Sequence, residues 1–338
     1  MKTQYPMWGD KPYYTISEYC KCNFGEKLYK IALDAGFTCP NRDGTLDTRG
    51  CIFCSAGGSG DFAVKTFYNS NQEIPPYTRQ IKSIGEQIKE GLSLFHAKKT
   101  GSRYIAYFQA YTNTYAPISY LELVYAEALG HPDIAGISIA TRPDCISDEC
   151  IELLVSLKKQ YPDKFIWIEL GLQTMHECTA NFIRRGYSLS VFEDTMSRLQ
   201  NHNIPVIVHV ILGLPGETDK MQYETIRYLN TWKPFGIKLQ LLHILKETDL
   251  AGYYTDPANK YEPLTKEHYL DLLIGCIERL SPDIILHRVT GDGPKSLLLA
   301  PTWSLNKRDV LNSLHKQMKE QHAYQGRLNS PPSNNGSL

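Results

Sequence analysis

The sequence predicts an α/β fold in which a parallel sheet is covered by helices. Apolar runs of strand length alternate with amphipathic stretches whose apolar residues recur every three or four positions. Runs such as IPVIVHVIL at 204–212 are almost continuously apolar, as in parallel strands that are buried on both faces. The chain has 338 residues, of which 42% are hydrophobic, and this is enough for one large domain with a substantial core.

Six strands are expected in order along the chain. They lie at 28–36, 103–111, 134–142, 164–172, 204–212 and 236–245. The helical stretches between them lie at 78–99, 118–130, 146–160, 191–203 and 219–232. An eight-fold barrel, an open doubly wound sheet and a partial barrel of six strand–helix units all fit this alternation.

We expect one domain with an addition at each end. Residues 1–27 precede the first strand, residues 28–280 hold the strand–helix units, and residues 281–321 form an extension over the mouth of the barrel. Residues 322–338 are polar and rich in proline, serine, asparagine and glycine, which predicts a disordered tail.

Charge and hydropathy argue against strong nucleic-acid binding through net charge, against a membrane span and against export. Lysine plus arginine and aspartate plus glutamate both total 36, so the net charge of zero gives no global attraction to nucleic acid. The longest strongly apolar run, about 204–214, is too short to span a bilayer, and residues 1–14 hold no apolar signal core. We expect a cytoplasmic protein without a membrane partner. Its nine cysteines fit reduced thiols better than a disulfide framework.

The strongest chemical signal is a loop with three cysteines that begins where the first strand ends. Cys39, Cys51 and Cys54 are spaced C-x11-C-x2-C among glycine, asparagine, aspartate and threonine residues. A structural zinc site needs four ligands, and the nearest downstream histidine is His96. Three thiolates suit a [4Fe–4S] cluster whose fourth iron is open to a substrate or cosubstrate. Zinc and three unrelated buried cysteines are the alternatives.

This loop and further segments resemble the radical S-adenosylmethionine superfamily. Phe53 stands directly before the last cysteine, as it does there, but the superfamily's usual spacing is C-x3-C-x2-C. The longer first interval resembles the YhcC/YtqA-like branch and, more distantly, the radical domain of the Elongator catalytic subunit. The similar segments lie at 9–11, 32–45, 50–63, 107–117, 138–145, 169–174, 212–218, 241–248 and 287–307.

The resemblance implies a partial (β/α)6 barrel of the TIM type and two cofactors, a [4Fe–4S] cluster and S-adenosylmethionine. Cys39, Cys51 and Cys54 would hold the cluster. Polar groups at 109–114 would hold the methionine amine, residues 169 and 173 the ribose, residue 185 the methionine carboxylate, and residues 213–215 the adenine. The implied cofactor-binding residues are Gln109, Tyr111, Thr112, Asn113, Thr114, Glu169, Gln173, Arg185, Gly213, Leu214 and Pro215. For Glu169, an internal ion pair is an equally ordinary role.

Charged residues near the strand ends are candidates for catalysis and selectivity. Arg142 and Asp144 follow the third strand, and His243 and Lys246 lie at or beyond the end of the sixth. Each could orient a substrate, move a proton or belong to an internal ion pair. In the extension, substrate selectivity is expected from the segment that holds His287, Arg288, Asp292 and Lys295.

The resemblance also implies a substrate and partners. The leading function is modification of the tRNA wobble uridine, from a 5-carboxymethylaminomethyl to a 5-aminomethyl side chain. A flavodoxin or ferredoxin would supply electrons, and a methyltransferase would act afterwards. The neutral net charge favours an alternative, a radical enzyme for a small metabolite or peptide. A non-catalytic iron–sulfur sensor or electron carrier is the third possibility, although it has no use for the nucleoside-binding segments at 109–114 and 212–218.

Overall fold

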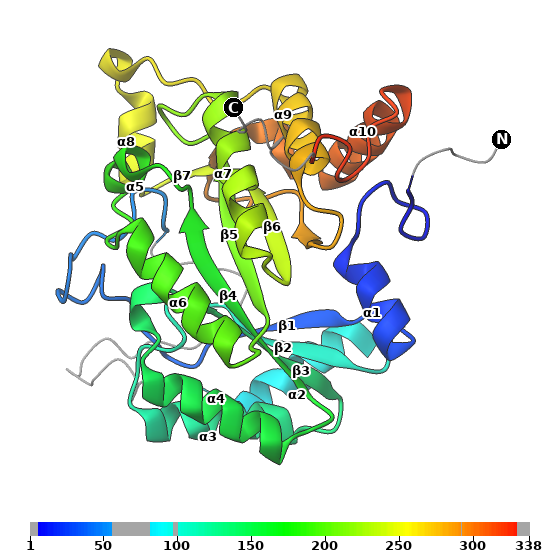
Figure 1. Ribbon diagram of the computed structural model, residues 1–338. Helices are drawn as coiled ribbons and strands as arrows, with labels where there is room; N and C mark the ends of the chain where they lie inside the picture. The colour runs from blue at the N-terminus through cyan, green and yellow to red at the C-terminus, as the bar shows by residue number, and fades with distance from the viewer. Residues whose placement is uncertain (1–5, 56–81, 97–100, 292, 330–338) are drawn as a thin grey trace, which may run out of the picture.

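Seven parallel strands form one curled, open sheet in the computed structural model, which describes residues 6–55, 82–96, 101–291 and 293–329 (Figure 1). Each strand pairs in parallel with its neighbours, and β1 and β8 are the two edges. The expected partial barrel is therefore confirmed, with seven strands where six were predicted. In sheet order these are β1 (Tyr29–Leu33), β2 (Tyr104–Phe108), β3 (Ile134–Thr141), β4 (Phe165–Gln173), β5 (Val206–Leu212), β6 (Gly236–Leu241) and β8 (Ile285–Arg288).

Helices cover the outer face of this sheet, as the alternation predicts (Figure 1). Outward-facing strand residues such as Ile168 and Val208 share one hydrophobic core with the apolar faces of these helices. Thr218 and Ser147 begin two of them with side-chain caps, accepting hydrogen bonds from the N–H groups of Met221 and Cys150. The helices are α2 (Ile84–His96), α3 (Ile118–Gly130), α4 (Asp148–Gln160), α6 (Leu189–Asn201), α7 (Asp219–Trp232) and α9 (Lys266–Arg279).

The inner face of the sheet changes from apolar to polar along the strands. At the amino-terminal end Ile105, Trp167 and Ile207 share an apolar cluster with α1 (Ile16–Phe24), which covers that end. Inward positions recur every second residue, so Glu169 and His209 lie one layer above Trp167 and Ile207. The strands therefore present a dry base below and a polar layer above it.

The carboxyl-terminal end of the sheet is covered by short elements with an apolar cluster of their own. Ile52 and Ile211 belong to this cluster together with residues of a small antiparallel pair, β7 and β9. The sixth apolar run thus holds two strands, because β7 turns away from the main sheet after β6. The covering elements are β7 (Ile244–Leu245), β9 (Leu298–Ala300), α5 (Glu177–Phe182), α8 (Asp249–Thr255) and the turns η2 (Pro143–Cys145), η3 (Pro257–Asn259) and η4 (Thr302–Leu305).

The C-terminal region differs from the expectation in two respects. Within the segment expected over the mouth, β9 and η4 do cover the carboxyl-terminal end of the sheet, but β8 joins the main sheet and α10 (Lys307–Glu320) packs on α9. The disorder expected from residue 322 is wrong for residues 322–329, because Ala323 and Gln325 are buried. The Gln325 amide donates to the carbonyls of Ser281 and Ile284, at 2.7 and 2.8 Å, and accepts from the Tyr14 N–H. Residues 330–338 lie outside the described residues.

Membrane-spanning helices are absent from the part of the chain described here, since none of its helices combines the necessary length and apolarity.

Candidate active site

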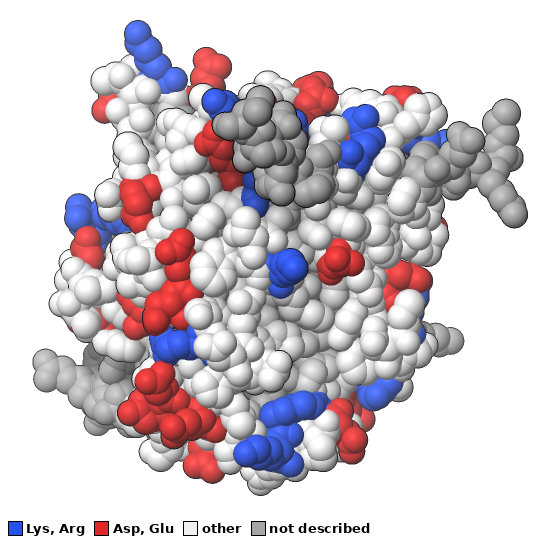
Figure 2. Space-filling model, viewed as in Figure 1, with Lys and Arg blue, Asp and Glu red and all other residues white. Residues whose placement is uncertain are grey.

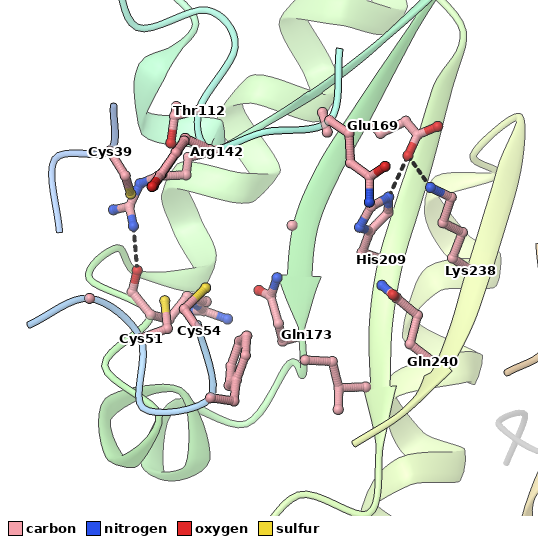
Figure 3. A pocket seen from close by; sticks show the side chains of 18 of the residues that line it. Cys39, Cys51, Cys54, Thr112, Arg142, Glu169, Gln173, His209, Lys238 and Gln240 are labelled. Carbon is pink, nitrogen blue, oxygen red and sulfur yellow. Dashed lines mark hydrogen bonds and ion pairs between the residues drawn. The ribbon is translucent and has the colours of Figure 1, made fainter. Parts of the chain in front are cut away.

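A pocket opens between the cysteine loop and the inner face of the sheet, at the carboxyl ends of the strands (Figure 3). Cys39, Cys51 and Cys54 line one wall, and Lys238 and Gln240 of β6 line the opposite wall. This position agrees with the rule that parallel α/β folds bind ligands at the carboxyl ends of their strands. The pocket therefore combines the three predicted thiols with the polar layer of the sheet.

The cysteine loop is held against the second half of the sheet by hydrogen bonds from its own residues. The Asn41 amide donates to the carbonyl oxygens of Arg184 and Arg185, at 2.9 and 3.3 Å, and to the Cys51 sulfur at 3.6 Å. The Arg42 guanidinium donates to the carbonyls of Cys54 and Ser55, at 2.9 and 2.6 Å. The loop therefore has a fixed path although it contains no helix or strand.

Glycines at two positions allow this packing. Gly50 has φ of 78°, and a Cβ there would lie 2.9 Å from Nε of Arg42. Gly186 has φ of 82°, and a Cβ there would lie 2.6 Å from Oδ1 of Asn41. Both backbone conformations favour glycine, and any side chain would displace the residues that anchor the loop.

The Cys51 thiol has the character of a metal ligand. A hydrogen bond from Cys54, opposed by burial and aided by Arg142 and Asn41, lowers the pKa of Cys51 to about 7. A thiolate is the form that binds metals. No three histidine, cysteine or carboxylate side chains among the described residues are gathered for a single metal ion. A cubic four-iron cluster spaces its thiolate ligands more widely than one ion does, and three thiols around one pocket fit that arrangement.

Arg142 and Asp144, both predicted as catalytic, form one unit. The Asp144 carboxylate accepts from Nε and Nη2 of Arg142, at 2.9 and 2.7 Å, and Arg142 also donates to the Arg185 carbonyl at 3.0 Å. Burial opposes the charge of Arg142, but Asp144 raises its pKa overall. Arg142 lines the pocket, whereas Asp144 lies against a separate cavity beside Cys145. Asp144 therefore positions Arg142 beside the cysteines.

Glu169 lies at the centre of a buried charge network. Its Oε1 accepts from Lys30 Nζ and Ser138 Oγ, both at 2.6 Å. Its Oε2 pairs with His209 at 2.7 Å and with Lys238. Burial alone would raise the pKa of Glu169, but the two lysines and His209 hold it well below its usual value. In this structure Glu169 therefore takes part in internal ion pairs, which is the second of the two roles expected for it.

Arg185 is also buried, with 2% of its surface exposed, and its guanidinium makes several hydrogen bonds to the protein. It donates to the carbonyls of Leu172, Thr174 and Tyr187, at 3.2, 2.8 and 3.0 Å, and to the Glu177 carboxylate at 3.2 Å. The guanidinium therefore fixes the turn after β4, and the expected contact with a methionine carboxylate would need these bonds to change.

The segment after β2 is divided between two sides. Gln109, Tyr111 and Thr112 line the pocket. Asn113 donates to the Ala140 carbonyl at 2.8 Å, and Thr114 Oγ1 lies 2.6 Å from Oγ1 of Thr141. The last two residues thus anchor the segment to β3 and are not part of the described pocket lining.

Gln173 also lines the pocket, with φ of 61°. Its side chain lies between the cysteines and the Glu169 network (Figure 3), and its Oε1 accepts from the Tyr187 hydroxyl at 3.3 Å.

Two further predictions fall outside the described pocket lining. Gly213, Leu214 and Pro215 form the turn after β5, where the Tyr261 hydroxyl donates to the Gly213 carbonyl at 2.8 Å. Lys246 is exposed beyond β7. These residues follow the ends of strands, as expected, but they are not part of the described pocket lining.

His243 does line the pocket, as expected. Its Nε2 is buried without a hydrogen-bond partner among the described residues. Burial, with Lys307 and Arg288 nearby, lowers the pKa of His243 to about 4. The ring is therefore neutral near pH 7 and able to accept a proton from a bound ligand.

Family comparisons agree with the predicted class. The model of the Radical SAM superfamily matches residues 48–229, and that of the Radical_SAM C-terminal domain matches residues 234–320. The chain belongs to the radical SAM superfamily. Radical SAM proteins use a [4Fe–4S] cluster and S-adenosylmethionine, and Cys39, Cys51 and Cys54 are the residues that would hold this cluster.

The similarity to individual proteins extends over most of the chain. It is 40% identical to YtqA of Bacillus subtilis (strain 168) over 319 residues, which cover 94% of this chain and 93% of that protein. It is 34% identical to YhcC of Escherichia coli (strain K12) over 303 residues, which cover 90% and 91%.

More distant relatives share the fold and part of their length. Elongator complex protein 3 of Schizosaccharomyces pombe is 20% identical over 290 residues, which cover 77% of this chain and 51% of that protein. The solved structure of the archaeal Methanocaldococcus infernus Elp3 superposes with a TM-score of 0.63 at 12% identity, covering 88% of this chain and 64% of that one.

Some pocket residues were missed by the sequence analysis. Tyr107, His209, Lys238 and Gln240 line the pocket from inward positions of β2, β5 and β6. Their signal was a polar residue at alternate positions of an otherwise apolar run, as in GIKLQL. A charge inside a buried strand needs a partner, so Lys238 and Glu169 could have been paired in advance.

We expect the metal-free protein to lose stability on acidification. Burial, followed by Lys238, lowers the pKa of His209 to about 4, and the pKa of His243 is also about 4. In the unfolded chain both would bind protons near pH 6.5, so the free energy of unfolding should fall as the pH drops from about 6.5 to 4.

Urea unfolding at a series of pH values measures this slope. His209→Gln keeps a donor for Glu169 but cannot titrate, and it should remove up to one proton from the uptake on unfolding. If the unfolding free energy of His209→Gln changes with pH as much as that of the wild type, His209 does not contribute to proton uptake on unfolding, which would contradict its lowered pKa.

Proposed function

We propose that this radical SAM protein modifies the wobble uridine of tRNA, converting a 5-carboxymethylaminomethyl side chain to a 5-aminomethyl side chain. The observation that carries the proposal is the pocket itself, in which three thiols on one wall face a polar wall that holds Lys238 and Gln240. A uridine side chain that ends in a polar amine and carboxylate suits a pocket lined by hydrogen-bonding side chains such as Gln240.

The relatives support RNA as the substrate class. The chain is 23% identical over 192 residues to a protein named tRNA uridine(34) acetyltransferase, from Methanocaldococcus jannaschii, and these residues cover 33% of that protein. Together with the Elongator relatives, this similarity favours uridine at the wobble position over other substrates of radical enzymes.

In this proposal, individual pocket residues place charge or accept a proton next to the reactants. When bound, the cluster and S-adenosylmethionine supply a 5′-deoxyadenosyl radical that removes a hydrogen atom from a substrate carbon. Arg142, fixed by Asp144, places a positive charge beside the cysteines. The neutral His243 can accept a proton at Nε2. Leu245 of β7 and Tyr187 complete the pocket lining with apolar surface.

A small metabolite or a peptide is the second candidate, and charge favours it. The net charge is zero, and acidic and basic side chains are interspersed on the face seen in Figure 2. A tRNA-binding protein usually presents a basic surface to the phosphates.

The tRNA proposal also includes two protein partners. A flavodoxin or ferredoxin would supply electrons, and a methyltransferase would act on the aminomethyl product.

Nucleosides of total tRNA test the proposal. In cells that lack the gene, mass spectrometry should find the carboxymethylaminomethyl uridine accumulated and the aminomethyl and methylaminomethyl forms lost. Restoring the gene should restore the parent profile, and restoring it with Cys51→Ala should not.

A profile identical in mutant and parent strains would overturn the tRNA assignment. The metabolite and peptide alternatives would then be tested with anaerobically reconstituted, reduced protein, by asking which extracts increase the formation of 5′-deoxyadenosine.

A further inference from the structure

Gln240 presents a side-chain amide that makes no hydrogen bond within the described part of the chain. It belongs to β6 and lies on the pocket wall opposite the cysteines (Figure 3). The side chain is partly exposed, so a molecule in the pocket can reach it. A carboxamide carries two N–H donors and one oxygen acceptor. Both kinds of group are therefore available to a ligand.

The neighbours of Gln240 in the sheet explain why its amide is unpaired. On the β5 side its register partner is Ile211, which is apolar. On the other side, the pairing of β6 with β8 ends at Lys238, two residues earlier. Leu242 and Leu245 also line this part of the pocket, and their side chains offer no polar atoms. An amide in such surroundings is unfavourable unless a ligand or a water molecule bonds to it.

The polar layer below Gln240 is bonded within itself. Lys238 donates to the Glu169 carboxylate and, at 3.0 Å, to the Tyr107 hydroxyl. His209 pairs with the same carboxylate at 2.7 Å. Gln240 follows Lys238 by two residues and points to the same face of the sheet. It therefore adds unused hydrogen-bonding groups above a network whose members already have partners.

His243, three residues after Gln240, is a second neutral group of this wall that lacks a partner. Its Nε2 is buried and makes no hydrogen bond to the described residues. A Cβ at Gly291 would lie 2.9 Å from this Nε2, and a Cβ at Gly293 would lie 2.8 Å from Nδ1, so the ring packs closely against both glycines. The two side chains together favour a ligand with neutral donors and acceptors.

We propose that Gln240 binds the uracil ring of the substrate, donating from its amide to O4 and accepting the N3–H. These neighbouring groups are one acceptor and one donor, which is the pattern that a carboxamide complements. Enzymes that act on a base read its Watson–Crick edge in this way after the base has left the stack. The Nε2 of His243 remains available to the substituent at C5. The choice of uracil rests on the proposed function.

Two synthetic anticodon stem–loops that differ only by a methyl group on N3 of the wobble uridine test this contact. The methyl group removes the donor that Gln240 would accept. Anaerobically reconstituted wild-type protein should bind the unmethylated RNA about ten-fold more tightly, as expected for one good base contact. Gln240→Leu should bind both RNAs equally. Gln160→Leu, the same substitution at an exposed glutamine that ends α4, should keep the preference.

The stability of Gln240→Leu is a control for misfolding. Because the amide has no partner and Ile211 is its neighbour, an apolar side chain at this position should leave the unfolding midpoint at or above that of the wild type. Gln240→Met keeps an unbranched chain of similar length without hydrogen-bonding groups. It is the second variant if Gln240→Leu does not fold, and it should lose the same preference.

A measurement without RNA separates failure of the uracil contact from failure of the proposed function. Uridine should raise the unfolding midpoint of the reconstituted wild-type protein, since a ligand that binds the folded state stabilises it. 3-Methyluridine, which lacks the N3–H, should leave the midpoint unchanged. Gln240→Leu should abolish the shift caused by uridine, and Gln160→Leu should retain it.

The two measurements together test the uracil contact and the tRNA proposal separately. Equal binding of both RNAs by the wild type, or an undiminished preference in Gln240→Leu, would overturn the uracil contact and leave the tRNA proposal standing. Wild-type protein that binds neither RNA would reject the tRNA proposal. The uracil contact would then be retained if uridine raises the midpoint only when Gln240 is present, and overturned if uridine has no effect.

Discussion

Replacing any one of Cys39, Cys51 and Cys54 by alanine is expected to abolish cluster binding and cleavage of S-adenosylmethionine. The superfamily cluster has three protein ligands, and the loop offers one thiol for each. Removing one ligand should lower cluster affinity and activity by more than the roughly 10- to 100-fold loss that is typical when a hydrogen-bond partner of a metal ligand is substituted. Iron and sulfide content, visible absorption and 5′-deoxyadenosine formed by the anaerobically reconstituted, reduced protein measure the effect.

Cys178→Ala is the matched control, because this exposed cysteine on α5 is not among the residues that line the pocket. It should retain the iron, the absorption and the cleavage of S-adenosylmethionine. A loop variant that keeps its full iron content and activity would show that the residue in question is not a ligand.

The cysteines could be predicted from sequence because their chemistry is local. Three thiols in a loop after a strand have few structural uses and suit an iron–sulfur cluster, and the resemblance of this loop and further segments to a known family implied the cofactor. The anchors of that loop could not be predicted, because they depend on the fold. Asn41 binds the backbone at 184 and 185, more than 140 positions away, and no feature of its own sequence neighbourhood indicates this contact.

The strands show the same division between local and distant information. Long apolar runs predicted six strands correctly, but β8 has four residues and lies in a segment rich in turns. It is a strand because Gly236 and Ile237 of β6 offer it an edge to pair with. An adenine-binding role for residues 213–215 was implied only by the family resemblance and stays a prediction; in the structure this turn packs against Tyr261 and Leu264 and is not part of the described pocket lining.

Glu169→Gln is expected to lower the free energy of unfolding by about 3–5 kcal/mol at pH 7, as breaking a buried ion pair does. The glutamine would remain among Lys30, Lys238 and His209 but could no longer compensate their charge. Urea unfolding of the metal-free protein measures the loss. Asp148→Asn, which removes a largely exposed partner of Arg198, should cost less than about 1 kcal/mol.

A second substitution distinguishes lost charge compensation from lost packing. Lys238→Met removes the more deeply buried lysine while keeping an unbranched chain, so the double variant with Glu169→Gln should regain part of the lost stability. If the free energy of unfolding falls by more in the double variant than in the two single variants added together, charge compensation is not the role of Glu169.

The pH dependence of the free energy of unfolding tests the role of Glu169 independently. The pKa of Glu169 is held below its unfolded value, so its contribution is complete above about pH 4.3 and is lost as the pH falls through the lower folded value. The difference between wild type and Glu169→Gln should therefore be constant from pH 7 to about 5 and shrink below pH 4. A difference that persists at the lowest pH would assign the destabilisation to altered packing around the amide, because by then the wild-type carboxylate would also be neutral.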